Sequence, residues 1–183
     1  MDTLVIPGFL SEGACETIVE AIRRAPAEAA PVYGTGNEGT YNANIRKVKK
    51  AAVPEMIALP VKVLVRKHLK RIGSHFGYEL TKIEPLQFLH YMTGDFFVAH
   101  QDGNTPLIRD DTLDRRVSIS VFLNGEDEYE GGRLMLHGAF PDFDRREDVS
   151  GDAGTLVAFR SETTHEVTPI TSGERFAIVT WLR

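Results

Sequence analysis

The sequence predicts a mainly β fold, a sandwich or a barrel, preceded by helices. Apolar residues in the first 77 positions recur at helical spacing. After Gly77, short apolar or alternating runs follow one another, separated by turn-forming pairs. The 183 residues are enough for one domain with a sizeable core. We therefore expect a single domain over 1–183, with a helical part at 1–77 and a β core at 78–183.

The first predicted helix begins after Ser11, whose side chain can cap it. It should end near Pro26. Cys15 is the only cysteine, so the chain cannot form an internal disulfide. On the apolar side of this helix, Cys15 is expected to be a small core residue rather than a reactive thiol. The apolar stripe consists of Ala14, Cys15, Ile18, Val19 and Ile22.

A glycine-rich segment and a second helix follow. Residues 33–41 hold three glycines and two tyrosines, a composition typical of a loop. A helix is predicted over about 60–76, where Pro60 fits the first turn. Its inward-facing apolar residues are Val61, Leu64, Val65, Leu69, Ile72 and Phe76.

The remaining chain reads as short strands. Pairs such as Thr93-Gly94, Asn124-Gly125 and Ser172-Gly173 favour turns between them. Short strands at this spacing suggest a sandwich or a barrel, with the helices covering one face. The runs are 83–91, 95–100, 117–123, 132–137, 154–159, 164–168 and 175–182.

The composition narrows the class of protein. Apolar residues make up 42% and charged residues 26%, which is ordinary for a globular protein. A net charge of −5 argues against a general nucleic-acid binder. No run approaches the roughly 18 apolar residues of a membrane span. The first residues lack a secretion signal, so we expect a cytoplasmic protein without a membrane partner; the oligomeric state stays open.

His100 and Asp102 form the first candidate chemical group. They are two residues apart on a predicted strand, so both side chains leave the same face. An imidazole and a carboxylate on one face can share a divalent metal, as in a 2-His-1-carboxylate site for Fe(II). The alternative is a surface pair on an edge strand, because this two-residue pattern is common by chance.

His165 and Arg175 extend this pattern. His165 lies in a late predicted strand, and Arg175 follows ten residues later. If the chain turns at 171–173, the two residues lie on adjacent strands and can face one cavity. The planar fork of an arginine near a metal can hold a carboxylate in a bidentate grip. Taken singly, His165 reads as a core histidine and Arg175 as an exposed charge.

The order of these residues resembles the Fe(II)/2-oxoglutarate oxygenases, in particular their prolyl 4-hydroxylase-like branch. The resemblance covers the last hundred residues or so and implies a double-stranded β-helix, or jelly roll. It is carried by LHYMTGDFFVAHQD (89–102), RRVSISVFLN (115–124), YEGGRLML (129–136), GTLVAFRSETTHEVTPI (154–170) and GERFAIVTWLR (173–183).

The resemblance also implies roles for individual residues. His100, Asp102 and His165 would be the metal ligands and the catalytic centre. Four further residues would form the cofactor site: Arg175 binding the distal carboxylate of 2-oxoglutarate, Tyr91 hydrogen-bonding the cofactor, Leu134 as an apolar wall, and Trp181 near the iron and the substrate mouth.

Two positions depart from the family pattern. Phe122 stands where some relatives have a second cofactor-binding tyrosine, and it cannot donate a hydrogen bond. Phe97 replaces a tyrosine of some members. Neither change removes a metal ligand, but Phe122 leaves the grip on 2-oxoglutarate open.

The activity implied by the resemblance is hydroxylation of a C–H bond with Fe(II), 2-oxoglutarate and O2, giving succinate and CO2; ascorbate is an optional cofactor. The expected substrate is a prolyl residue in a protein or peptide, over which 33–41 and 103–114 would fold. Alternatives are a 2-oxoglutarate oxygenase for a free amino acid or small metabolite, a cupin-like metal protein without 2-oxoglutarate chemistry, and a non-catalytic jelly-roll binding module.

Overall fold

The computed structural model describes residues 1–31, 42–106, 108, 110–139 and 141–183. Within these residues the chain forms two α-helices, α1 (Glu12–Arg24) and α2 (Glu55–Phe76), and a short 3-10 helix, Asp111–Asp114. The strands are β1 (Thr3–Ile6), β2 (Ala27–Ala29), β3 (Arg46–Lys47), β4 (Lys49–Ala51), β5 (Gln87–Tyr91), β6 (Phe96–His100), β7 (Val117–Phe122), β8 (Tyr129–Gly131), β9 (Leu134–His137), β10 (Arg146–Asp148), β11 (Leu156–Arg160), β12 (His165–Val167), β13 (Ile170–Gly173) and β14 (Arg175–Leu182).

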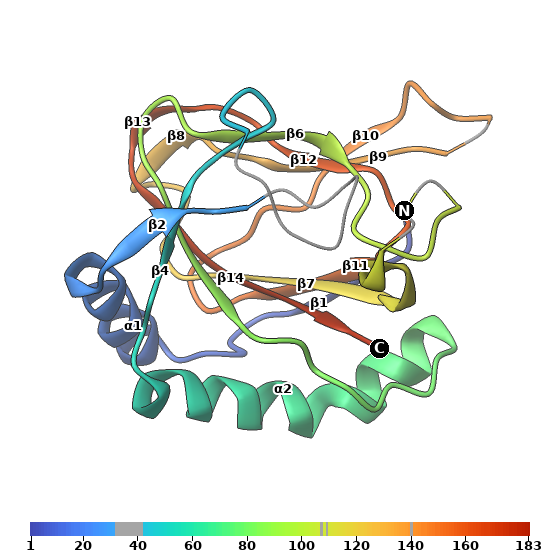
Figure 1. Cartoon of the computed structure of the whole chain (residues 1–183), viewed down its shortest axis with the longest axis horizontal. Coiled ribbons are helices and arrows are strands. Elements are labelled where there is room, and N and C mark those ends of the chain that lie inside the picture. The colour runs from blue at the N-terminus through green and yellow to red at the C-terminus, as the bar shows by residue number, and fades with distance from the viewer. Residues whose placement is uncertain (32–41, 107, 109, 140) are drawn as a thin grey trace.

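The strands form two antiparallel sheets that face each other. The major sheet has the order β1-β11-β7-β14-β5-β4-β2, and the minor sheet has the order β10-β9-β12-β6-β3. A two-stranded ribbon, β13-β8, lies at one end. Figure 1 shows the minor sheet above the major sheet and α2 beneath both. The predicted jelly roll with covering helices is therefore confirmed.

Strand β7 shows how its sequence fits the middle of this arrangement. All six of its residues are buried, because one face meets the helices and the other meets the minor sheet. Val117, Ile119 and Val121 pack toward the helices. Ser118 and Ser120 alternate with them and therefore face the space between the sheets. Buried serines on an otherwise apolar strand bring hydroxyl groups to that space.

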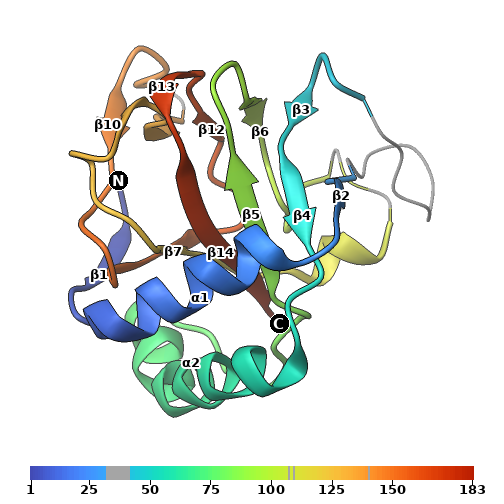
Figure 2. The same cartoon turned by 90° about the vertical axis from the view of Figure 1, so that its left-hand side faces the viewer.

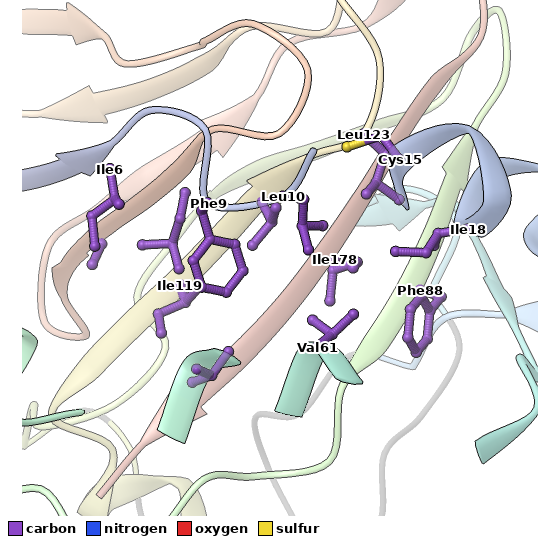
Figure 3. Close-up of a cluster of buried hydrophobic side chains, with 14 of the residues drawn as sticks. Ile6, Phe9, Leu10, Cys15, Ile18, Val61, Phe88, Ile119, Leu123 and Ile178 are labelled. Carbon is purple, nitrogen blue, oxygen red and sulfur yellow. The ribbon is translucent and has the colours of Figure 1, made fainter. Parts of the chain in front are cut away.

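Two apolar cores hold the layers together. The first joins α1 and α2 to the outer face of the major sheet (Figures 2 and 3), with Ile18, Val61 and Ile178 among its members. The second lies between the sheets and includes Leu89, Leu136 and Phe159. One core covers the outer face of the major sheet and the other covers its inner face. Together they remove apolar surface from water on both sides of this sheet, which fixes it at the centre of the molecule.

Helix α1 follows the sequence closely. Ser11 caps it by accepting a hydrogen bond from the Ala14 amide. Cys15, Ile18 and Ile22 are buried on the predicted stripe. Burial raises the pKa of Cys15 to about 11, so this thiol stays protonated at neutral pH and serves as a core residue.

Helix α2 begins earlier than predicted. It starts at Glu55 rather than at residue 60, with Pro54 as its N-cap and Pro60 inside. Pro60 lies in the second turn of the helix. Because proline has no amide N–H, the helix lacks one backbone hydrogen bond there. The helix ends at Phe76, and its C-cap Gly77 adopts a left-handed backbone conformation with φ of 75°.

The sequence predicted a helical part at 1–77, but this part also contains strands. Four short strands, β1 to β4, lie within the first 77 residues and join the two sheets. Three of them are only two or three residues long, so they carry almost no alternation that a sequence pattern could reveal. The predicted loop at 33–41 lies outside the described residues.

Candidate metal centre

Two strands of the minor sheet bring the predicted ligands together. His165 on β12 stands opposite His100 on β6, and Asp102 is the second residue after the end of β6. One ligand atom from each of the three side chains lies within 4.8 Å of the others. The Asp102 carboxylate lies 3.5 Å from His100 Nε2 and 3.3 Å from His165 Nε2. The cross-strand register therefore places the late histidine beside the two-residue motif.

Backbone carbonyls orient both imidazole rings. His100 Nδ1 lies 2.8 Å from the carbonyl oxygen of Val98, and His165 Nδ1 lies 2.9 Å from that of Thr163. A hydrogen bond from Nδ1–H to a carbonyl leaves Nε2 as the metal-binding nitrogen. Both Nε2 atoms face the Asp102 carboxylate. The histidines thus present the tautomer that a metal site needs.

Asp102 is held by β7 and by the segment after β11. Ser118 donates a hydrogen bond of 2.6 Å to Asp102 Oδ2, and its hydroxyl also lies 3.1 Å from that of Ser161. The Asp102 amide donates to the Ser161 carbonyl at 2.9 Å. The sequence analysis missed Ser118. The feature that could have indicated a role for Ser118 is its position: it is a serine on the inward face of an otherwise apolar, buried strand.

The three ligands are electrostatically coupled. Burial opposes ionisation of Asp102, yet the two histidines together hold its pKa well below the usual range. Burial and the neighbouring His165 lower the pKa of His100. Burial also lowers the pKa of His165, but Asp102 outweighs this and raises it on balance. A carboxylate that stays ionised beside imidazole nitrogens suits a divalent cation, which would replace the proton on His165.

A cavity between the two sheets, which we call the sheet cavity, runs from these ligands to Arg175. Its empty volume, counted with the space that is open to solvent, is about 470 Å³. Its walls are Arg46, Leu89, Tyr91, Phe97, His100, Asp102, Ser118, Ile119, Ser120, Leu134, Phe159, His165, Val167, Arg175, Val179 and Trp181. All seven residues predicted for the site, including Tyr91, Leu134 and Trp181, line this one cavity.

Arg175 is the most buried charge of the cavity, with 2% of its surface exposed. Its guanidinium carbon lies 5.1 Å from the ring centres of both Tyr91 and Phe122. Among the described residues, no carboxylate forms an ion pair with it. A buried cation without a partner is costly, so the site is built for an anion from outside the chain.

One detail of the sequence analysis was wrong. His165 and Arg175 do not lie on adjacent strands: His165 is on β12 of the minor sheet, and Arg175 is on β14 of the major sheet. The intervening β13 pairs with β8 in the ribbon and carries the chain from one sheet to the other. The two residues still share the sheet cavity, because they face each other across the sandwich.

A second cavity, the loop cavity, adjoins the first at the ligands. It shares Arg46, Phe97, His100, Asp102 and Trp181 with the sheet cavity. The other lining residues are Pro31, Ile45, Gln101, Ile108, Asp110, Thr112 and Arg115. The candidate metal centre therefore opens to two spaces, one ending at Arg175 and one bordered by Ile108, Asp110, Thr112 and Arg115.

An ion cluster fixes the wall of the loop cavity. Arg115 binds Glu84 with both ends of its guanidinium, at 2.9 and 2.7 Å, and Arg183 binds the same carboxylate at 2.6 Å. The Arg115 guanidinium carbon lies 3.8 Å from the ring centre of Trp181. This cluster, which the sequence analysis did not predict, holds Trp181 beside the metal ligands.

Comparison with known proteins agrees with this geometry. Residues 86–183 match the model of the 2OG-Fe(II) oxygenase superfamily. The chain belongs to this family. It is therefore a dioxygenase enzyme of a family that uses iron and 2-oxoglutarate, which decides against the cupin-like and non-catalytic alternatives.

Relatives in the family are named PKHD-type hydroxylases. That of Acinetobacter baumannii (strain SDF) is 30% identical over 181 residues, covering 97% of this chain and 76% of the relative. That of Alteromonas mediterranea is 34% identical over 108 residues, covering 56% of this chain but only 44% of the relative.

Solved oxygenase structures share the fold. A prolyl-4-hydroxylase from Pseudomonas putida has a TM-score of 0.75 at 24% identity, covering 100% of this chain and 92% of its own. A Trichoplax adhaerens prolyl hydroxylase, in complex with a peptide fragment of hypoxia inducible factor, has a TM-score of 0.77 at 18% identity, covering 99% and 83%. Neither helix in the described part of this family member has the length and hydropathy to cross a bilayer.

Proposed function

We propose that this oxygenase hydroxylates a prolyl residue in a protein or peptide, with Fe(II) bound by His100, Asp102 and His165. The observation that carries the proposal is the pairing of two groups in one cavity. The three metal-ligand side chains lie at one end, and the buried Arg175 lies at the other without a carboxylate partner among the described residues. A metal-chelating anion with a second carboxylate fits this pair.

The site residues of the sheet cavity then have defined roles in binding the metal ion and 2-oxoglutarate. Two imidazoles and one carboxylate hold the ion and leave positions open for other ligands. Arg175 binds the distal carboxylate of 2-oxoglutarate, and Tyr91 supplies a hydroxyl in the same cavity. Leu134 forms an apolar wall that excludes water. When bound, the iron and its co-substrates supply the oxidising power for C–H hydroxylation, with succinate and CO2 as products.

The loop cavity is the proposed place for the substrate. Its lining includes the apolar side chains of Ile45, Phe97 and Trp181, and the Arg115 guanidinium is already paired with Glu84. A compact apolar ring such as that of proline suits these walls better than a charged side chain does. Two of the solved neighbours are prolyl hydroxylases, which favours the same substrate class.

An anaerobic titration tests the chemistry. The protein is mixed with Fe(II) and then with 2-oxoglutarate, while the visible charge-transfer band of the chelate is recorded. We expect the band in the wild type and its loss in Asp102→Ala. Arg175→Ala should need at least about tenfold more 2-oxoglutarate, because a charge-assisted bidentate pair is lost. Failure of the wild type to bind Fe(II), or Mn(II) in its place, would contradict the proposal.

A second experiment addresses the substrate. Proline-containing peptides and cell extracts are incubated with the active enzyme, and peptides are searched by mass spectrometry for the mass of one added oxygen on proline. Succinate formation stimulated by free amino acids or metabolites, but by no peptide, would instead support the small-molecule alternative.

A further inference from the structure

Beside Arg175 lies a tyrosine hydroxyl that the proposed mechanism does not use. Tyr129, the first residue of β8, is 6% exposed. Its hydroxyl is buried and makes no hydrogen bond in the structure. Arg175 Nε is buried and unbonded as well. Two buried polar groups without partners, a donor and an acceptor, are unusual in one place and need a reason.

The two groups lie together around Gly132. A Cβ atom built on Gly132 would lie 3.1 Å from Arg175 Cδ and 3.3 Å from Tyr129 Cε2. The glycine, with a positive φ of 61°, therefore allows the two side chains to approach each other. The effect is also electrostatic: burial raises the pKa of Tyr129, and the charge of Arg175 opposes that rise.

Phe122 cannot perform the same task. Its ring lies 5.1 Å from the guanidinium carbon of Arg175 but carries no hydroxyl. Tyr129 is not among the residues that line the sheet cavity, whereas Arg175 is. The Tyr129 hydroxyl is thus placed to act on the arginine from behind the cavity wall.

We propose that Tyr129 is a positioning residue for Arg175 in binding the distal carboxylate of 2-oxoglutarate. Its hydroxyl accepts a hydrogen bond from Arg175 Nε–H, so that the two terminal nitrogens of the guanidinium face the ligand. Without the anion the two groups are close but form no hydrogen bond of good geometry, and the anion would draw the guanidinium into line with the hydroxyl. This inference rests on the proposed function, because it needs 2-oxoglutarate at Arg175.

Tyr129→Phe removes the hydroxyl and keeps the ring. The matched control is Tyr78→Phe, because the Tyr78 hydroxyl also bonds an arginine, Arg160 at 2.8 Å, away from the site. Binding to the Mn(II)-loaded protein is measured by calorimetry with two ligands. One is 2-oxoglutarate, and the other is 2-oxopentanoate, which has the same chain length but no distal carboxylate.

We expect Tyr129→Phe to bind 2-oxoglutarate about tenfold more weakly, the effect of one hydrogen bond to a charged group. Its affinity for 2-oxopentanoate and for Mn(II) should not change, and Tyr78→Phe should match the wild type throughout. In turnover, KM for 2-oxoglutarate should rise while kcat stays near the wild-type value. A purely structural hydroxyl would not produce this selectivity.

Thermal unfolding without ligand supplies a second measurement. Removing an unbonded buried hydroxyl should leave Tm of the ligand-free protein unchanged or raise it, and the rise in Tm on adding 2-oxoglutarate with Mn(II) should be smaller in Tyr129→Phe. A lower Tm of the ligand-free variant, or equal 2-oxoglutarate affinity in variant and wild type, would overturn the role of Tyr129. Absence of 2-oxoglutarate binding by the wild type would overturn the proposed function itself.

Discussion

At the scale of single residues, the candidate metal centre depends on which atom each side chain presents. His100 and His165 each use Nδ1 to bind a backbone carbonyl, which directs Nε2 toward Asp102. The half-buried carboxylate lies between them, and the two histidines hold its pKa well below the usual range. Each ligand is therefore oriented by a neighbour before any ion arrives, which lowers the cost of binding.

Asp102→Ala should abolish both metal binding and succinate formation, because a three-ligand site loses its only charged ligand. Mn(II) binding by calorimetry and succinate release are the measurements. The exposed Asp144→Ala serves as the control and should keep wild-type values. Normal succinate release by Asp102→Ala would rule out this carboxylate as a ligand.

Ser118→Ala should weaken metal binding about tenfold while the fold is retained, because the ligand Asp102 loses the hydroxyl that orients it at 2.6 Å. Mn(II) affinity in the absence of 2-oxoglutarate is the measurement. Ser120→Ala is a matched control on the same face of β7. Equal losses in the two variants would show that the hydrogen bond to Asp102 is not the cause.

At the scale of elements, the loop cavity depends on three segments joined by one carboxylate. Glu84 precedes β5, Arg115 precedes β7, and Arg183 follows β14. Burial opposes ionisation of Glu84, but Arg115 and Arg183 together lower its pKa. The cluster ties the ends of three neighbouring strands and supports Trp181 through the stacked Arg115.

Glu84→Gln should lower the free energy of unfolding by about 3 kcal/mol, because it leaves two guanidinium groups near a neutral partner in a buried place. Urea denaturation at neutral pH measures this loss. The exposed Glu79→Gln is the control and should change the free energy of unfolding by less than about 0.5 kcal/mol. A similar small loss in Glu84→Gln would mean that the cluster is solvated in solution.

At the scale of the whole molecule, the central major sheet separates structural from chemical tasks. Its outer face packs on α1 and α2, whereas its inner face supplies Tyr91, Ser118 and Arg175 to the sheet cavity. The minor sheet supplies His100 and His165. Because the two sheets contribute different groups to one site, any loss of their packing also removes the site.

Acid should lower the free energy of unfolding that the ion cluster of Glu84 contributes, in a defined pH range. The folded pKa of Glu84 lies below its ordinary value of 4.5. Its contribution to stability is therefore complete above about pH 4.5 and is lost as the pH falls through the folded pKa. The difference in free energy of unfolding between wild type and Glu84→Gln should be constant near neutral pH and narrow below pH 4.5. Urea denaturation from pH 7 to pH 3 measures it; a difference that widens in acid would contradict this account.

Local features of the fold can be predicted from the amino-acid sequence alone. Helix α1 follows from its cap and apolar stripe, and the strands β5, β6, β7, β9, β11, β12 and β14 follow from alternation and turn pairs, because both depend on neighbours in the chain. The two-residue motif of His100 and Asp102 was readable for the same reason. The shorter strands β8, β10 and β13, like β1 to β4, were not predicted. His165 and Arg175 were singled out by their ten-residue spacing around a predicted turn, and resemblance to a family supplied their roles.

Contacts between segments that are distant in the chain become visible only in the folded molecule. The tertiary structure placed His165 and Arg175 on opposite sheets, joined Ser118 to Asp102, and set Tyr129 behind Arg175. It also brought Glu84, Arg115 and Arg183 into one cluster. None of these contacts leaves a periodic trace, because each depends on strand order and register across the sandwich rather than on spacing along the chain.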